Sequence, residues 1–214
     1  MALSTADRVN AVLEYWFGSG VATADNDYVP DDKRKLWFGG GPEVDQYITE
    51  HFGADVEAVA DGTYDEWCSA AQPRATVAGI ILMDQFTRNI YRGKPEAFSL
   101  DGKALSWAQQ AVADGSAAQL PAVLRYFLLM PYMHSEDLAV QEAGVVLFRE
   151  AAEAAEAGGH KAAAGVLRGA LAYQEAHRDV VKAWGRFPHR NAILGRASTP
   201  QELAGLADGS IRKF

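Results

Sequence analysis

Apolar residues recur along most of the chain with the spacing of an amphipathic helix. The first such face has the i, i+3, i+4, i+7 pattern of one helix side and consists of Val9, Val12, Leu13 and Trp16. Ser4 and Asp7 resemble a capping box in front of this face, and Gly18 ends the pattern. The sequence therefore predicts a helix close to the N-terminus.

Proline, glycine and capping residues divide the rest of the chain into further helices. Proline is favourable in the first turn of a helix because its missing N–H would be unpaired there. Two helices are predicted to begin at Pro42 and at Pro200. Between them we predict five more, which run from Pro73 to Gly93, from Asp101 through Val112, from Pro121 to Pro131, from Ser135 to Gly158 and from His160 to Trp184. Ser135 is the expected N-cap of its helix, with Glu136 and Asp137 in the first turn. The stretch 77–83 is apolar on every side, which is typical of a helix surrounded by others.

Neither strands nor a second domain are indicated by the pattern. We find no sustained alternation, no clean internal repeat and no linker, and the short gaps between helices favour antiparallel neighbours. The sequence thus predicts one all-helical domain over residues 1–214.

Charge and cysteine content narrow the classes of partner. The 214 residues include 28 acidic and 20 basic side chains, which gives a net charge of −8. Binding to nucleic acid needs a basic face that neutralises phosphates, so no nucleic-acid partner is expected.

No membrane partner is expected either, because the apolar run 77–83 is far shorter than the roughly 20 residues of a spanning helix. Since Cys68 is alone and residues 1–10 lack a signal-peptide pattern, we expect a cytoplasmic protein.

The first candidate functional segment lies in the predicted helix from residue 73. Asp84 shares a face with apolar residues, and Arg88 follows one turn later, so the two can pair laterally. A buried ion needs such a partner. The pair is therefore either a structural ion pair, with Gln85 and Asn89 holding neighbouring loops, or part of a ligand site.

The second candidate segment surrounds the predicted start of the helix at Ser135. Capping accounts for Glu136 and Asp137, but neither for His134 nor for Gln141 on the apolar face. A histidine beside carboxylates can act as an acid–base group or as a metal ligand.

Two further candidates lie towards the C-terminus. His177 is on the inner face of the longest helix, either as a hydrogen-bonded core residue or as a ligand. The turn after this helix carries four polar side chains, namely Arg186, His189, Arg190 and Asn191. Because guanidinium groups bind carboxylates and phosphates with two parallel hydrogen bonds, this turn is a structural staple, an anion-binding lip, or both.

Common catalytic and cofactor motifs are absent from the sequence. It has no HExxH, no Gly-x-Ser-x-Gly and no phosphate-binding Gly-Lys-Ser/Thr loop. The spacing of His134, His177 and His189 matches no recognised metal-ligand pattern. We therefore predict neither a metal nor a cofactor.

Taken together, these segments resemble an uncharacterised bacterial family, the "domain of unknown function 924" group. The pieces that carry the resemblance are Tyr15 to Gly18, Trp37-Phe38, Asp84 to Asn89, Met130-Pro131 with His134 to Asp137, and Gly185 to Asn191. The resemblance implies a right-handed array of antiparallel helix pairs, similar to tetratricopeptide-repeat folds. It implies no activity.

Our leading hypothesis is a polar pocket that binds a small anionic molecule or a short peptide. Asp84 would orient Arg88, and Arg88 with Arg186 or Arg190 would hold the anionic group. The other expected ligand-binding residues are Gln85, Asn89, Gln141, His177 and Asn191, with Trp16, Trp37 and Phe187 as apolar walls.

Two alternatives belong to other functional classes. In an acid–base enzyme of hydrolase or lyase type, His134 or His189 would transfer protons, and Asp137 or Glu136 would orient the imidazole. In a protein–protein interaction scaffold, a concave helical surface would bind the partner and the polar motifs would only stabilise the fold.

Overall fold

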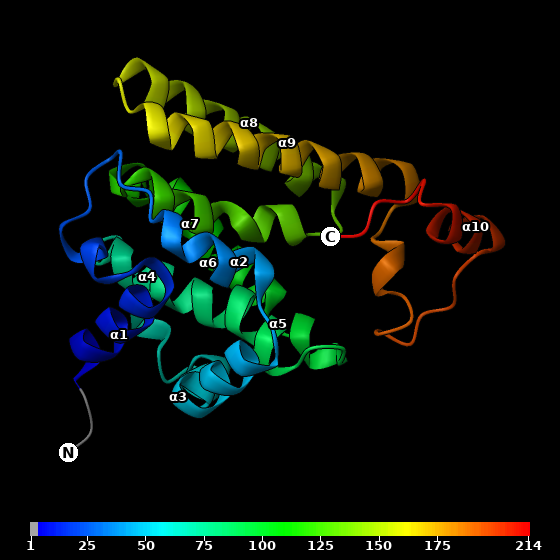
Figure 1. The fold of residues 1–214 in the computed structure, drawn as a ribbon, viewed down its shortest axis with the longest axis horizontal. Helices are drawn as coiled ribbons and strands as arrows, with labels where there is room; N and C mark the ends of the chain where they lie inside the picture. The colour runs from blue at the N-terminus through cyan, green and yellow to red at the C-terminus, as the bar shows by residue number, and fades with distance from the viewer. Residues whose placement is uncertain (1–3) are drawn as a thin grey trace.

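A computed structural model describes residues 4–214 of the chain. Helices make up all the regular structure in this range, which contains no strand (Figure 1). The α-helices are α1 (Thr5–Phe17), α2 (Arg34–Gly39), α3 (Pro42–Ala60), α4 (Pro73–Ile80), α5 (Thr87–Ile90), α6 (Asp101–Ala113), α7 (Ala122–His134), α8 (Leu138–Ala157), α9 (Lys161–Trp184) and α10 (Pro200–Asp208). Short 3₁₀ turns are η1 (Ser19–Thr23), η2 (Asp31–Lys33), η3 (Asp65–Trp67), η5 (Pro95–Phe98), η6 (Ser116–Gln119) and η7 (Pro188–Arg190), and η4 (Ile81–Phe86) is π-helical. The all-helical class is thus confirmed for the described part; residues 1–3 of the predicted domain lie outside it.

The long antiparallel pair α8 and α9 lies along one side of α7, and α4 and α6 pack on α7 from other directions (Figure 1). Phe127 of α7 is central, with edge-on contacts to the rings of Trp16, Phe17 and Trp37 at centroid distances of 5.7, 5.2 and 4.8 Å. The long apolar stretch that begins at Val77 is fully buried between these helices, as its pattern predicts. No helix in residues 4–214 combines the length and the apolar character that crossing a bilayer requires.

Local signals set several of these boundaries as predicted. Ser4 Oγ accepts a hydrogen bond from the backbone N–H of Asp7, whose carboxylate accepts one from the N–H of Ser4, so the capping box of α1 is confirmed. The helices predicted to begin at Pro42, Pro73 and Pro200 do begin there.

The boundary between α7 and α8 differs from the prediction. Helix α7 continues through Pro131 to His134, because the burial of its last two turns outweighs the roughly 3 kcal/mol cost of an interior proline. Ser135 is then the C-cap of α7, and Asp137 is the N-cap of α8, since its carboxylate accepts from the N–H of Ala139 at 2.7 Å. As a consequence, His134 lies in the last turn of a buried helix rather than in a loop.

The helix predicted from Pro73 to Gly93 is also different in detail. It ends at Ile90, and its middle part, η4, is a π-helix whose six residues are all buried. A π-turn inserts one residue into the helical repeat and rotates the side chains that follow, and such turns are frequent at functional sites. Asp84 lies inside this π-helix, so its carboxylate is directed by an irregular backbone.

Candidate functional site

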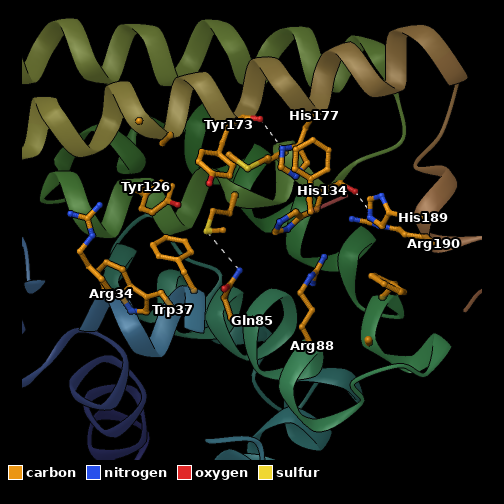
Figure 2. Close-up of a pocket in the computed structure, with 18 of the residues that line it drawn as sticks. Arg34, Trp37, Gln85, Arg88, Tyr126, His134, Tyr173, His177, His189 and Arg190 are labelled. Carbon is orange, nitrogen blue, oxygen red and sulfur yellow. Dashed lines mark hydrogen bonds between the residues drawn. The ribbon is translucent and has the colours of Figure 1, made fainter. Parts of the chain in front are cut away.

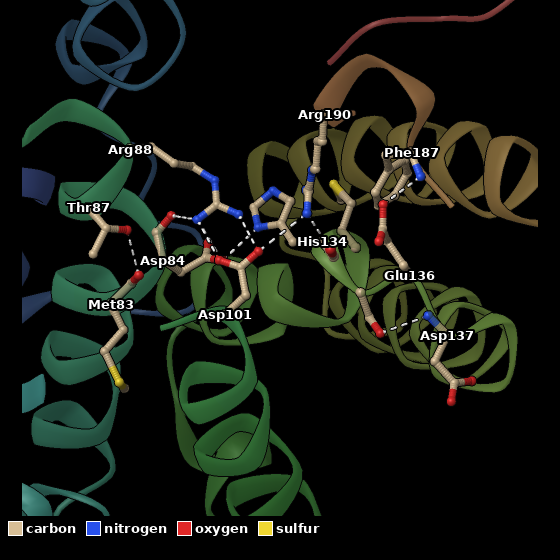
Figure 3. A network of polar contacts seen from close by, with 12 residues as sticks. Met83, Asp84, Thr87, Arg88, Asp101, His134, Glu136, Asp137, Phe187 and Arg190 are labelled. Carbon is tan, nitrogen blue, oxygen red and sulfur yellow. Dashed lines mark hydrogen bonds and ion pairs between the residues drawn. The ribbon is translucent and has the colours of Figure 1, made fainter. Parts of the chain in front are cut away.

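Asp84 and His134, from η4 and α7, are in direct contact at the candidate site (Figure 3). Asp84 Oδ1 lies 2.6 Å from His134 Nδ1, and Asp84 Oδ2 accepts a hydrogen bond from Gln85 Nε2, also at 2.6 Å. Burial alone would raise the pKa of Asp84, but His134, Arg88 and these hydrogen bonds outweigh burial and hold the pKa well below its usual range. The ionised carboxylate accepts from Nδ1–H and leaves His134 Nε2 for other contacts.

Arg88 connects this pair to a second carboxylate. Its guanidinium donates to the backbone carbonyl of Asp84 at 2.5 Å and lies 3.4 Å from the Asp84 carboxylate. On its other edge it donates to Asp101 at 3.0 Å. Burial opposes the charge of Arg88, but the two carboxylates outweigh that effect and raise its pKa. Both terminal nitrogens of Arg88, Nη1 and Nη2, are therefore engaged by the protein itself.

Arg190 approaches the same cluster from η7. Its Nη1 lies 3.4 Å from Asp101 and donates to the backbone carbonyl of His134 at 3.1 Å (Figure 3). The guanidinium carbon lies 4.6 Å from the ring centres of both Phe98 and Phe187, and the side chain is only 8% exposed. Burial and the neighbouring Arg88 lower the pKa of Arg190 to about 10, so it stays cationic at neutral pH.

Two donors of Arg190 lack a partner within residues 4–214. Its Nε is buried without a hydrogen bond, and no protein group accepts from its Nη2. A buried donor left unpaired is unfavourable by about 1–3 kcal/mol. Arg190 is thus the cation of the cluster with hydrogen-bonding capacity to spare.

The cluster borders a cavity of about 670 Å³, shown in Figure 2. The polar and ionisable residues of its lining are Arg34, Gln85, Arg88, Arg92, Tyr126, His134, Tyr173, His177, His189 and Arg190. Within residues 4–214, four arginines and three histidines line it, and no aspartate or glutamate does. A volume in the range of about 300–1,000 Å³ is typical of small-molecule sites. The cavity therefore has a positively charged rim within an acidic protein.

The cavity is elongated, with different chemistry at its two ends (Figure 2). At one end His134, Arg88 and Arg190 face one another. At the other end Arg34 and Trp37 of α2 lie below α9. The rest of the lining is contributed largely by apolar or aromatic groups such as Phe38, Tyr126, Met130, Val166 and Ala170.

The other two histidines of the cavity are neutral at neutral pH. Burial, helped by His134, lowers the pKa of His177 to about 3, and its Nδ1 lies 2.7 Å from the carbonyl of Tyr173. Burial and the adjacent Arg190 lower the pKa of His189 to about 4. The ring of Phe214 is stacked on His177 with centroids 3.5 Å apart and covers one side of the cavity.

The structure brings some of the predicted site residues together at the cavity and places the others elsewhere. Six of the predicted residues line the cavity, with Asp84 directly behind them: Gln85, Arg88, His134, His177, His189 and Arg190. The other predicted residues contact different parts of the protein: Asn89, Gln141, Asp137, Arg186 and Asn191. Of the three predicted aromatic walls, Trp37 lines the cavity, whereas Trp16 and Phe187 are core residues.

The residues outside the cavity have identifiable structural partners. Asn89 donates to Asp45, and Gln141 donates to the carbonyls of Met133 and Ser135 at the end of α7.

The polar residues near α10 form a separate cluster. Arg186 makes two hydrogen bonds to the buried carboxylate of Glu202, at 2.7 and 2.8 Å, and the side-chain amide of Asn191 lies 3.4 Å from the same carboxylate. The turn after α9 is therefore divided, with Arg190 at the cavity and Arg186 in this separate staple.

The carboxylate that contacts His134 is also not the one expected from the sequence. Asp137 caps α8, and Glu136 is engaged by Arg196 at 2.6 and 2.9 Å and by the N–H of Phe187 at 2.7 Å. Asp84, which is distant in sequence, takes the place beside the imidazole.

Several residues at or beside the cavity carry no signal that points to a site in the sequence. Asp101 stands out there only as the start of a predicted helix, although its carboxylate bridges Arg88 and Arg190. Gly165 and Gly169 are visible as two glycines four apart inside a helical pattern, a signal that could have pointed to this face of α9. In residues 4–214, no group of three or more His, Cys, Asp or Glu side chains is arranged to hold a metal ion.

Comparisons with known proteins identify one family and one similar solved structure. The family model described as "Bacterial protein of unknown function (DUF924)" matches residues 12–210. Among solved structures, a protein of unknown function from Agrobacterium tumefaciens, ATU0120, is 30% identical, with a TM-score of 0.73 over 96% of this chain and 100% of that one. No curated protein matches the chain.

Proposed function

Because the chain belongs to a family of bacterial proteins of unknown function, we propose a function from the site itself: the protein binds a small anionic molecule in the cavity beside Arg190. The observation that carries this proposal is the buried, cationic guanidinium of Arg190, which retains unpaired donors at the edge of a cavity lined by arginine and histidine. A carboxylate or phosphate would supply the acceptors that these donors lack.

The other charges of the cluster favour Arg190 over Arg88 as the anchor. Both terminal nitrogens of Arg88 are held by Asp84 and Asp101, so Arg88 has less capacity left for a ligand than Arg190. Its positive charge still offsets the two carboxylates, which would otherwise repel an anion from the cavity. Arg88 therefore acts as a support, and Arg190 provides the contact.

Isothermal titration calorimetry with inorganic phosphate and with acetate tests this proposal. We expect the binding heat of the wild type to be lost in Arg190→Met, in which the new side chain can still pack between the rings of Phe98 and Phe187. Arg149→Met is the matched control, because Arg149 forms a half-exposed pair with Glu175 outside the cavity. Equal binding by all three proteins would refute the proposal.

A second candidate function rests on the contact between Asp84 and His134. A buried carboxylate on Nδ1 fixes the tautomer of the imidazole and leaves Nε2 as a proton acceptor at the cavity, as general acid–base catalysis requires. An acid–base enzyme would use the same anion contact to hold its substrate. Polar groups that converge on one cavity support these two functions over docking of a partner protein. The right-handed tetratricopeptide-like array implied by the family resemblance is part of the proposal, and the antiparallel course of α8 and α9 supports it.

A further inference from the structure

One wall of the cavity is a helix face that carries two glycines. Gly165, Gly169, Tyr173 and His177 follow one another at intervals of four residues along α9, and all four line the cavity. A Cβ atom added at Gly165 or at Gly169 would meet nothing within 4 Å. Neither glycine is therefore required by close packing, and their absent side chains widen the cavity.

The helix would be more stable with alanine at both positions. Glycine in a helix interior is less favourable than alanine by about 1 kcal/mol. Both glycines lie well inside α9, and neither has the positive φ that would require a glycine at that position. What they leave open is a bare strip of helix that faces the cavity.

Aromatic and apolar groups face this strip from the other walls. Trp37 and Phe38 come from α2, and Tyr126 and Met130 come from α7 (Figure 2). Phe38 is 64% exposed and Tyr173 is 54% exposed, so ring surface remains uncovered at the cavity. This middle part offers few hydrogen-bonding groups, namely the amide of Gln85 and the hydroxyls of Tyr126 and Tyr173.

The strip and the cationic end are continuous. From Gly165 to His177 the helix advances by about 18 Å, at about 1.5 Å per residue. His177 lies beside His134, with ring centroids 6.1 Å apart, and Arg190 donates to the carbonyl of His134. A ligand bound by its charged group at Arg190 can thus extend along the glycine strip.

We propose that the ligand is an amphiphilic acid. Its carboxylate binds Arg190, and its apolar body, an acyl chain or an aryl-alkyl group, lies along Gly165 and Gly169 opposite Trp37. The inference rests on the proposed anion site and adds the chemical class of the molecule. A sugar or a peptide backbone would leave polar groups without partners in the middle of the cavity, which is unfavourable.

A series of unbranched carboxylates tests the inference. Acetate, hexanoate and decanoate, each below its micellar concentration, are titrated into the protein, with binding followed by calorimetry and by tryptophan fluorescence. We expect the affinity to rise roughly fourfold per methylene that becomes buried. A parallel series with phenylacetate and phenylbutyrate distinguishes an aryl body from an acyl body.

The glycine strip is tested by filling it. Gly169→Leu should remove the gain from chain length, a loss of at least tenfold for decanoate, and leave acetate binding unchanged. Gly165→Leu is a second variant in case the first does not fold. Gly53→Leu is the matched control, because Gly53 is also inside a helix with open space around its Cβ position, but away from the cavity.

The outcomes separate the two proposals. If acetate binds through Arg190 but decanoate binds no tighter, the amphiphile inference is wrong and the anion site stands. If decanoate binds tightly and Gly169→Leu and Gly165→Leu fold without weakening it, the body lies elsewhere and the inference is again overturned. If Arg190→Met affects none of the carboxylates, the anion site itself is refuted.

Discussion

The carboxylate of Asp84 accepts a hydrogen bond from Nδ1 of His134, although fifty positions separate the two residues in the sequence. One lies in the π-helical η4 and the other in the last turn of α7, and these segments pack directly on each other. Arg88, one turn after Asp84, completes the neutralisation of the buried carboxylate. The pair thus links fold stability to the orientation of the imidazole at the cavity.

Replacing Asp84 with asparagine should affect stability and the imidazole together. The variant removes a buried charge and leaves Arg88 with one carboxylate fewer, so we expect a loss of about 3–5 kcal/mol in the free energy of unfolding. Urea denaturation measures this loss, and ¹⁵N chemical shifts of His134 report the expected change in tautomer. Asp137→Asn is the control, because asparagine also serves as an N-cap and should cost only a few tenths of a kcal/mol. Equal losses in the two variants would contradict the assigned role of Asp84.

Stability should fall as the pH is lowered from about 6.5. His177 and His189 have pKa values of about 3 and about 4 in the folded protein, against 6.5 for an unperturbed imidazole. Between pH 6.5 and pH 4 the unfolded chain therefore binds protons that the folded protein does not, and stability decreases on acidification by up to about 1.4 kcal/mol per pH unit for each histidine.

Urea denaturation at pH 7.5, 6.5, 5.5 and 5.0 measures this slope. Carboxylates contribute only at lower pH, because the ordinary pKa values of Asp84 and Glu202 are 3.8 and 4.5. The double variant His177→Gln, His189→Gln should flatten the curve in this window, whereas His51→Gln, at an exposed position on α3, should not. A wild-type curve that is already flat would show that the two imidazoles become protonated without penalty in the folded protein.

Replacing glycine with alanine should change the stability of the protein in opposite directions in α8 and in α9. Gly165→Ala and Gly169→Ala place their methyl groups in open space, so each should stabilise the protein by about 0.5–1 kcal/mol through helix propensity. Gly144→Ala should destabilise it by about 1–3 kcal/mol through overpacking, because the new Cβ would lie 2.7 Å from the side-chain oxygen of Gln174. Gln174 is fully buried and bonded to Gln141, so it cannot move aside. Thermal unfolding of the three variants checks this, and a stabilising Gly144→Ala would contradict the close approach of α8 and α9.

The parts of the fold that the sequence predicts are those encoded within one turn of helix. The capping box of Ser4 and Asp7 and the start of α3 at Pro42 depend only on neighbouring residues. Pro131 is different, because whether a helix continues through a proline depends on the burial that surrounds it. The same holds for the π-helix, which no local residue pattern used above indicates.

The candidate site is predictable to a similar extent. His134, Arg88 and Arg190 stand out because they interrupt apolar faces or lie in a constrained turn. Which carboxylate meets which cation depends on the packing of distant helices, so neither the pairing of Asp84 with His134 nor the bridge through Asp101 could be read from spacing. Asp137, close in sequence to His134, is instead used by the backbone of α8.

Arg186 and Arg190, which lie four residues apart in one turn, should separate stability from binding. Glu202 is 2% exposed and depends on Arg186 for two of its hydrogen bonds, so Arg186→Met leaves a buried carboxylate without its cation and should lower the free energy of unfolding. Arg190→Met leaves Asp101 still bound to Arg88, and a methionine can occupy the space between Phe98 and Phe187.

We therefore expect Arg186→Met to bind decanoate with the affinity of the wild type, measured where the variant is fully folded, and to unfold at lower urea concentration. Arg190→Met should lose binding and retain most of the stability. The pH dependence of stability below pH 4.5 adds a check. Arg186 lowers the pKa of Glu202 to about 2, so the stability that the ionised Glu202 contributes is lost as the pH falls from 4.5 towards 2. This loss of stability at low pH should be smaller in Arg186→Met and unchanged in Arg190→Met. If both variants lose stability equally and keep binding, both arginines are fold determinants, and the anion must contact other residues.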